Sequence, residues 1–273
     1  MIQIRPELCV GCGSCVDDCF PNALELSEGQ AALAHEDWCI RCGHCIAVCP
    51  TAAVWDDEQN MDEVRELSPE VRQVDGQALL NLMQFRRATR HFCPDPVPEE
   101  VLAALLNAGR WCPTAVNRQG TSFIVVREQI AALKDLAVRR LGLLGQVMLM
   151  KGDTPDMLRR AEKFVVWSKR IKKEPDFDPL FFHAPLLVMT VSDERGRLDA
   201  VSAATYMELE AVAQGLGVLY SGYFAAAAQG NEEISAALGL AQGQELVRCL
   251  VLGWPDIQFR RVPPRDPADV RYL

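Results

Sequence analysis

Eight of the eleven cysteines stand in two short runs near the N-terminus, and this clustering constrains the fold more than any other feature. Both runs have the spacing C-x2-C-x2-C-x3-C; the first holds Cys9, Cys12, Cys15 and Cys19, and the second holds Cys39, Cys42, Cys45 and Cys49. Cysteines at i, i+3 and i+6 let one loop wrap around a cubane cluster and present three thiolates to its irons. The fourth ligand must then come from elsewhere in the chain.

Zinc is the alternative occupant, because eight cysteines could hold two zinc ions in four-cysteine sites. Such sites usually take C-x2-C pairs from two separated knuckles, whereas each run places all four cysteines within eleven residues. We therefore expect iron-sulfur clusters rather than zinc.

Charge and hydropathy limit the partners and the compartment. The net charge is -9 with a pI near 5.1, which argues against binding to nucleic acid or to an anionic membrane. The N-terminus shows no apolar core of signal-peptide length. The longest apolar stretch, LGLLGQVMLM, stops at Lys151, short of the roughly 18 residues of a membrane span. We expect a cytoplasmic protein whose thiols stay reduced and bind metal.

Residues 1–57 resemble a bacterial ferredoxin with two [4Fe-4S] clusters, because Pro50 follows the second run and completes the pattern. The resemblance implies that the fourth cysteine of each run serves the other cluster. One cluster would bind Cys9, Cys12, Cys15 and Cys49, and the other Cys39, Cys42, Cys45 and Cys19. Such modules carry single electrons, so the reaction belongs to the rest of the chain.

Residues 58–76 are acidic and lack a clear apolar stripe, and we interpret them as a linker to a second domain at 77–273. Apolar, β-branched runs at 121–128, 185–193 and 245–254 predict buried strands. Helical patterns occur at 77–90, from Pro98 to before Pro113, at 198–217, and at 231–239 behind an asparagine cap. We expect an α+β fold in which helices flank a central mixed sheet.

Four motifs in the second domain point to a flavin. RRATR at 86–90 gathers three guanidinium groups, the side chains best suited to phosphate. CPTAVNRQ follows at 112–119, GLG leads into VLYSG at 215–222, and Arg260 and Arg261 follow LGW. Together and in this order, the motifs resemble those of the FMN-dependent nitroreductase family over residues 79–273.

The resemblance implies a set of cofactor-binding residues and a homodimer whose flavin sites draw on both chains. The set comprises Arg86, Arg87, Arg90, Arg260 and Arg261 for the phosphate or the polar ring edge, Thr114 and Asn117 from the second motif, and Tyr220, Ser221 and Gly222 beside flavin N5. No acid/base dyad is evident, and water and Tyr220 are the two proton sources that we consider.

These observations predict a ferredoxin–nitroreductase fusion that passes electrons from two [4Fe-4S] clusters to FMN and then to a small acceptor such as a nitroaromatic or a quinone. Reduced ferredoxin, flavodoxin or NAD(P)H are the candidate donors. A redox sensor or electron-transfer adaptor with a protein partner is the rival, and reductive dehalogenation or flavin breakdown is a third reading. Residues 139–180 fit either a lid or a helical core stripe.

Overall fold

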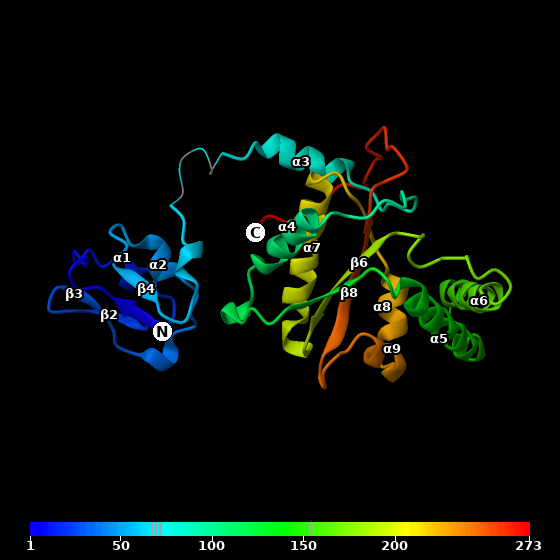
Figure 1. The fold of residues 1–273 in the computed structure, drawn as a ribbon, viewed down its shortest axis with the longest axis horizontal. Helices are drawn as coiled ribbons and strands as arrows, with labels where there is room; N and C mark the ends of the chain where they lie inside the picture. Colours follow the sequence, from blue (N-terminus) through cyan, green and yellow to red (C-terminus); the bar gives the residue numbers. More distant parts are fainter. Residues whose placement is uncertain (67, 69, 71–72, 153) are drawn as a thin grey trace. The chain divides into compact units, whose positions relative to one another are not determined.

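The computed structural model describes residues 1–66, 68, 70, 73–152 and 154–273. The chain divides into two compact units (Figure 1): Met1–Val74 with Thr114–Arg118, and Asp75–Pro113 with Gln119–Leu273. The division after Val74 lies within the expected linker, of which residues 67, 69, 71 and 72 lie outside the described residues. The segment 114–118 groups with the first unit, which its sequence did not indicate.

The first unit is built from short elements around the two cysteine runs. Its strands are β1 (Ile2–Ile4), β2 (Leu24–Ser27), β3 (Gln30–Leu33) and β4 (Val54–Asp56). Its helices are α1 (Ser14–Asp17) and α2 (His44–Val48), with 3-10 turns η1 (Glu36–Trp38), η2 (Met61–Glu63) and η3 (Ala115–Asn117). β1 pairs with β4, and β2 forms a hairpin with β3, both antiparallel. The strands are too short to give a periodic sequence signal, and we did not predict them.

The apolar core of the first unit is small and is interrupted by thiols. Its buried members are Ile2, Cys15, Leu24, Ala31 and Val54, and five more cysteines of the two runs pack against them. A core of this size buries too little apolar surface to hold a domain by itself. We therefore expect the stability of the first unit to depend on what its cysteines bind.

The second unit contains the remaining elements. Its helices are α3 (Gly76–Phe85), α4 (Glu99–Arg110), α5 (Ile130–Lys151), α6 (Pro155–Arg170), α7 (Arg197–Ala213), α8 (Gly222–Ala228) and α9 (Glu232–Ala237), with η4 (Glu194–Gly196). Its strands are β5 (Ser122–Val126), β6 (Leu186–Ser192), β7 (Gly217–Tyr220) and β8 (Glu245–Gly253). The three expected strands are confirmed, as is the cap on α9, where the Asn231 side chain accepts a hydrogen bond from the Ile234 N–H. We did not predict β7.

The sheet has the order β5-β6-β8-β7, and all three strand pairs are antiparallel. The prediction of a mixed sheet is therefore wrong for the four strands, which pair only in the antiparallel sense. Among the described residues, the one parallel pairing is an isolated bridge between Ala88 and Val218. The reason lies in the connections: two helices join β5 to β6, and two join β7 to β8. A pair of helices returns the chain to the end of the sheet where it left, so the next strand runs in the opposite direction.

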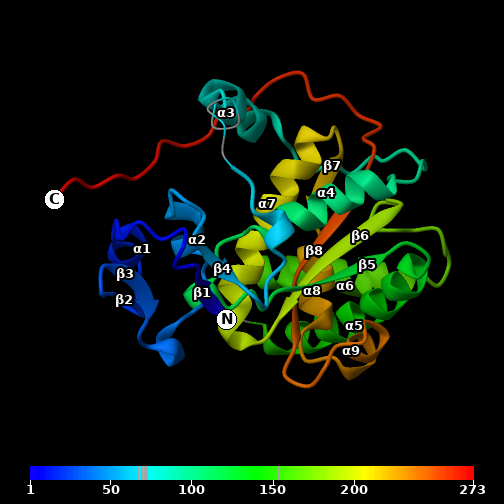
Figure 2. The same ribbon diagram turned by 60° about the vertical axis from the view of Figure 1, so that its left-hand side comes forward.

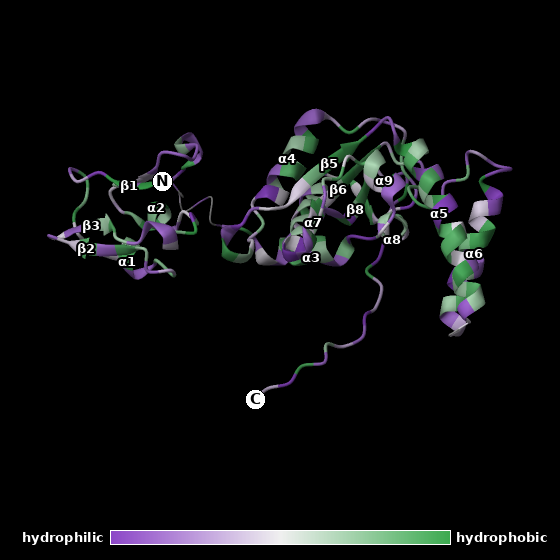
Figure 3. Ribbon diagram, turned by 90° about the horizontal axis from the view of Figure 1, so that it is seen from below, coloured by the Kyte–Doolittle hydropathy of each residue, from purple (hydrophilic) through white to green (hydrophobic). Residues whose placement is uncertain are grey.

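Helices cover both faces of this sheet (Figure 2), and the confirmed fold class is α+β. Along β6, Leu186 and Val188 pack with α4 and α7, whereas Leu187 and Met189 pack with α5 and α8. All seven residues of β6 are buried, and Figure 3 shows the central strands coloured as hydrophobic. The sheet is therefore buried between two apolar layers.

Helices α5 and α6 pack along each other and occupy much of the segment 139–180. Leu141 is fully buried in the core and also lines the cavity described below, as do the less buried Leu144 and Met148. The helix pair therefore contributes to both core and cavity, and the lid stays a prediction; residue 153 lies outside the described residues. Within the described part of the chain, no helix has the length and apolar character to cross a membrane.

Candidate functional site

Each set of four cysteines expected for one cluster lines one small cavity of the first unit. The first cavity is lined by Cys9, Cys12, Cys15 and Cys49, and the second by Cys19, Cys39, Cys42 and Cys45. The last cysteine of each run thus reaches across to the cavity of the other run. This arrangement supports the crossed assignment that the ferredoxin resemblance implied.

Backbone N–H groups point at several of these sulfurs. The N–H of Ala31 donates to Cys9 Sγ at 3.5 Å, and the N–H groups of Ala23 and Ala53 donate to Cys19 and Cys49 Sγ at 3.2 Å each. Hydrogen bonds to the sulfurs stabilise a thiolate and tune the potential of a cluster. The donor set fits an iron-sulfur cluster.

The thiols differ in their acidity because their surroundings differ. Burial raises the pKa of Cys45 to about 12, whereas the Ser14 hydroxyl lowers the pKa of Cys12. At Cys49, burial by itself would raise the pKa, but hydrogen bonds from the N–H groups of Thr51 and Ala53 outweigh it, and the pKa is lowered. Because the thiolate is the metal ligand, a metal must displace the proton from Cys45. Among the described residues, no three His, Cys, Asp or Glu side chains are placed to hold a single metal ion.

The two cysteine loops share a left-handed backbone position but have different residues there. Gly11 has a φ of +67°, and a Cβ there would lie 2.1 Å from the Gly29 carbonyl oxygen. Arg41 holds the matching position in the second loop with a φ of 52°, and its Nε donates to Asp56 Oδ2 at 3.2 Å. The Asp56 side chain is fully buried, so Arg41 ties the second loop to β4.

In the second unit, the arginine segment 86–90 is held beside β7. The Thr89 N–H donates to the Val218 carbonyl at 3.0 Å, and Ala88 forms its bridge to the same residue. A Cβ on Gly217 would lie 2.6 Å from Thr89 Cγ2, so this close approach requires glycine. Because Tyr220, Ser221 and Gly222 continue from β7, two sequence motifs 130 residues apart come to one place.

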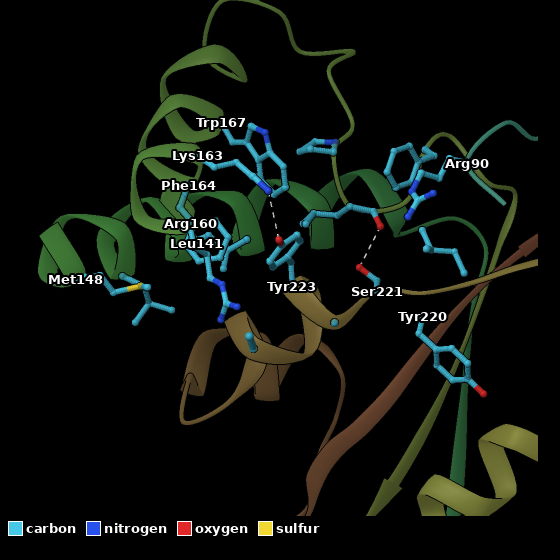
Figure 4. Close-up of a pocket in the computed structure, with 17 residues that line it drawn as sticks. Arg90, Leu141, Met148, Arg160, Lys163, Phe164, Trp167, Tyr220, Ser221 and Tyr223 are labelled. Carbon is cyan, nitrogen blue, oxygen red and sulfur yellow. Dashed lines mark hydrogen bonds between the residues drawn. The ribbon is translucent and has the colours of Figure 1, made fainter. Parts of the chain in front are cut away.

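The three arginines of this segment have different surroundings. Arg86 Nη1 lies 2.9 Å from Oε1 of the buried Glu208, so its charge is paired within the chain. Arg87 Nη1 donates to the Arg86 carbonyl at 2.6 Å. Arg90 is exposed and lines the large cavity shown in Figure 4. The cavity therefore receives one of the three expected guanidinium groups.

The segment 220–222 forms one edge of that cavity. Ser221 is 5% exposed; its N–H donates to the Cys249 carbonyl at 2.9 Å and its hydroxyl to the Leu180 carbonyl at 3.0 Å. Gly222 has open space where a Cβ would lie, so its backbone is accessible to a bound ring. The segment is thus rigid and unobstructed.

Tyr220 is turned away from the cavity. Its hydroxyl donates to the Ala204 carbonyl on α7 at 3.0 Å, and Figure 4 shows the ring pointing away from the labelled α6 side chains. Burial raises the pKa of Tyr220 above its ordinary value, and the nearby Glu208 carboxylate adds to the shift. The hydroxyl is a poor proton source for a ligand in this cavity.

The cavity has a volume of about 700 Å³ and lies between the α5–α6 pair and the segments 179–182 and 219–223. Its size is within the range of small-molecule sites, roughly 300–1,000 Å³. A smaller cavity of about 360 Å³, lined by Glu208 and Arg248, shares the edge at 220–222. The larger cavity is the candidate flavin and acceptor site.

The other expected residues lie elsewhere. Thr114 and Asn117 belong to the first unit, where Asn117 Nδ2 donates to the Arg41 carbonyl at 2.7 Å and to the Ile40 carbonyl at 3.3 Å. Arg260 and Arg261 are exposed in a C-terminal segment without helix or strand. None of these four residues lines the large cavity in the described part of the chain.

Four side chains that line the cavity lie outside the expected cofactor set, namely Arg160, Lys163, Trp167 and Tyr223; the sequence indicated Trp167 only as part of the lid or core segment 139–180 and missed the other three. Arg160, Lys163 and Trp167 lie on α6, where spacings of three and four place them on one helical face with Phe164. That spacing of cations and aromatic residues is the sequence signal that could have identified this face of α6 as part of the cavity lining.

Residues 83–254 match the model described as the nitroreductase family. The chain belongs to the nitroreductase family. Residues 8–53 match the 4Fe-4S dicluster domain, so this family member carries a ferredoxin domain fused to its N-terminal side. The same region is similar to an uncharacterized ferredoxin of Methanocaldococcus jannaschii, with 38% identity over 55 residues, covering 19% of this chain and 89% of the relative. A ferredoxin of Pyrobaculum islandicum is 41% identical over 54 residues, 19% of this chain and 50% of the relative.

Solved structures of nitroreductases share the fold of the second unit. A nitroreductase with bound FMN from Bacteroides fragilis has a TM-score of 0.55 at 18% identity, and the match covers 71% of this chain and 98% of that one. An FMN-bound nitroreductase from Desulfitobacterium hafniense has a TM-score of 0.53 at 22% identity, with 71% and 97% covered. At these identities, the similarity shows a shared fold. Which ligands this chain binds must be inferred from its own residues.

Proposed function

We propose that the protein is an FMN-dependent oxidoreductase in which electrons enter through two [4Fe-4S] clusters and reduce a small organic acceptor beside the flavin. One observation carries the proposal: the Thr89–Val218 hydrogen bond places the arginine segment next to Tyr220–Gly222, at the edge of a cavity of about 700 Å³. The FMN-bound nitroreductases of similar fold support a flavin there.

The two sets of four cysteines hold the clusters in this proposal. Each set surrounds one cavity, and the N–H groups of Ala23, Ala31 and Ala53 are directed at its sulfurs. Burial and these donors set the potentials at which single electrons pass. A reduced ferredoxin or flavodoxin is the donor class that matches such clusters, with NAD(P)H as the alternative.

The flavin-binding residues of one chain are Arg90, the backbone of Ser221 and Gly222, and the neighbouring Arg86 and Arg87. FMN supplies two-electron reducing chemistry from single-electron donors when it is bound. The rigid backbone at Ser221 orients the ring, and Arg90 offers a paired hydrogen-bond donor to its polar edge or its phosphate. Because Arg86 is paired with Glu208, we assign Arg90 the larger share of the binding.

A homodimer completes the site in our proposal. Thr114 and Asn117 do not line the cavity of their own chain, and Arg260 and Arg261 lie in an exposed C-terminal segment. In an isologous dimer, these residues of one chain can serve the flavin of the other. This arrangement gives a role to all four motifs that the sequence carries.

The acceptor receives two electrons and two protons in each turnover. A quinone then becomes a quinol, and a nitro group becomes a nitroso group with release of one water. Since the Tyr220 hydroxyl donates to Ala204, water entering the cavity is the proton source that we propose. A cavity of this size favours a small acceptor over the adaptor alternative, which a narrow, filled pocket would have supported.

Replacement of one cluster ligand tests the electron path. Cys45→Ser should lower the iron content and slow the reduction of bound FMN by a low-potential donor at least tenfold, while FMN stays bound in the second unit. Cys93→Ser is the matched control, because Cys93 lies outside both runs. Iron, sulfide and FMN counted after anaerobic purification should give about eight irons per chain and one FMN. Unchanged FMN reduction in the Cys45 variant would contradict the proposed path.

A further inference from the structure

The cavity beside Tyr220–Gly222 has a cationic rim. Arg90, Arg160 and Lys163 line it, and its wall contains no Asp or Glu. Arg160 and Lys163 are exposed on α6, and in the described part of the chain none of the three cations forms an ion pair. Three positive charges in the lining of one cavity, two of them on α6, favour an anionic ligand by Coulomb attraction.

Next to the cations is a wall of aromatic rings. Tyr223 stands edge-on to Trp167, with ring centroids 5.4 Å apart, and edge-on to Phe164 at 5.2 Å. Lys163 Nζ donates to the Tyr223 hydroxyl at 3.4 Å, and it lies 5.9 Å from the centre of the Trp167 ring. Figure 4 shows Lys163 between Trp167 and Tyr223, and the lysine is exposed, so its charge lies beside the aromatic wall and is accessible to solvent. A flat ring can pack on this wall with a charged substituent at the rim.

We propose that the acceptor is a planar aromatic compound that bears a carboxylate, with its ring against Trp167 and Tyr223 and its carboxylate between Arg160 and Lys163. The inference rests on the proposed function and adds to it the class of acceptor. A guanidinium binds a carboxylate through two parallel hydrogen bonds, and the ammonium adds a point charge. The remaining cation, Arg90, stays with the flavin.

Two acceptors of the same shape separate charge from ring stacking. 4-Nitrobenzoate and 4-nitrobenzamide share the ring and the nitro group and differ in the charge of the other substituent. Their dissociation constants are measured by calorimetry on the oxidised, FMN-loaded full chain. We expect nitrobenzoate to bind about tenfold more tightly, and the double variant Arg160→Gln with Lys163→Gln to reduce this preference to less than twofold. Lys169→Gln is the matched control, because Lys169 is exposed on α6 and does not line the cavity.

Equal affinity of the unmodified protein for the two compounds would overturn the inference. So would loss of FMN from the double variant, since the two cations would then be holding the flavin phosphate. Circular dichroism checks that the exposed substitutions leave the fold intact. Turnover of both compounds without a preference for nitrobenzoate would contradict the inference and would still support the proposed function. Preferred binding of nitrobenzoate without any turnover would contradict the proposed function and would still support an anion-binding site.

Discussion

The two units of the chain are stabilised in different ways. In the first unit, five buried residues, one of them a cysteine, form the core, and the backbone donates hydrogen bonds to sulfur. In the second, a four-stranded sheet is buried between two helical layers, and β6 is buried along its whole length. We therefore expect the first unit to need metal to fold, whereas the second obtains its stability from apolar packing. Each of the following predictions tests this contrast.

Removal of iron should have the largest effect. Anaerobic chelation is expected to unfold the first unit, because its burial alone is insufficient, and to leave the second unit folded. Hydrogen exchange measures this directly: amides of β1 to β4 should lose essentially all protection, while those of β6 and β8 keep theirs. Retained protection in the first unit would show that its core is stable without metal.

Leu105→Ala should destabilise only the second unit. The side chain is fully buried between α4 and the sheet, so its removal leaves a cavity and costs about 2–5 kcal/mol. Chemical denaturation followed by a probe in the second unit measures the change, and the iron content should not change. Leu198→Ala, at a position that is 79% exposed, serves as the control and should change stability by less than about 0.5 kcal/mol. Similar effects from both variants would argue against packing as the source of stability.

The loop at 178–183 of the second unit contains an acceptor for several backbone N–H groups. The sulfurs of the first unit likewise accept hydrogen bonds from backbone N–H groups. The Asp178 carboxylate accepts from the N–H groups of Leu180, Phe181 and His183 at 3.1, 2.9 and 2.9 Å. Asp178→Ala should therefore cost about 1–3 kcal/mol, and Asp178→Asn less. The exposed Asp176→Ala is the control, and thermal unfolding gives the comparison. A negligible loss would mean that apolar packing alone holds this loop.

The smallest effect is expected from pH. The folded state raises the pKa of Tyr220 above its unfolded value of about 10, so the native state binds the proton more tightly. The resulting stability is complete below pH 10 and is lost as pH rises through the folded pKa. Tyr220→Phe should flatten this alkaline fall in the melting temperature of the second unit. It should also leave acceptor turnover nearly unchanged, because the hydroxyl faces Ala204.

Local sequence patterns predicted the elements whose own residues carry a strong local signal. The strands β5, β6 and β8 follow from apolar, β-branched runs, and the cap of α9 follows from Asn231. β7 was missed because its four residues stand within a motif that we interpreted for its function. The antiparallel pairing depends on pairs of helices between strands, a property that no single segment encodes.

The candidate site was predicted in part. The sequence identified Arg90, Ser221 and Gly222, which the structure brings to one cavity. It did not indicate that Arg86 is paired with Glu208, 122 residues away, or that Asn117 donates to the Arg41 carbonyl. It also missed Arg160 and Lys163, because charged residues on a helix normally indicate only a solvated face.

The sequence alone determined the chemistry of the first unit. Three ligands of each expected cluster depend on the spacing of cysteines within one loop, and covalent connectivity sets that spacing before any distant contact forms. Only the tertiary structure decided which arginine faces the cavity, where the Tyr220 hydroxyl points, and which cations line the opposite wall. These directions depend on packing between segments far apart in the chain, because a side chain adopts the orientation that its buried neighbours allow.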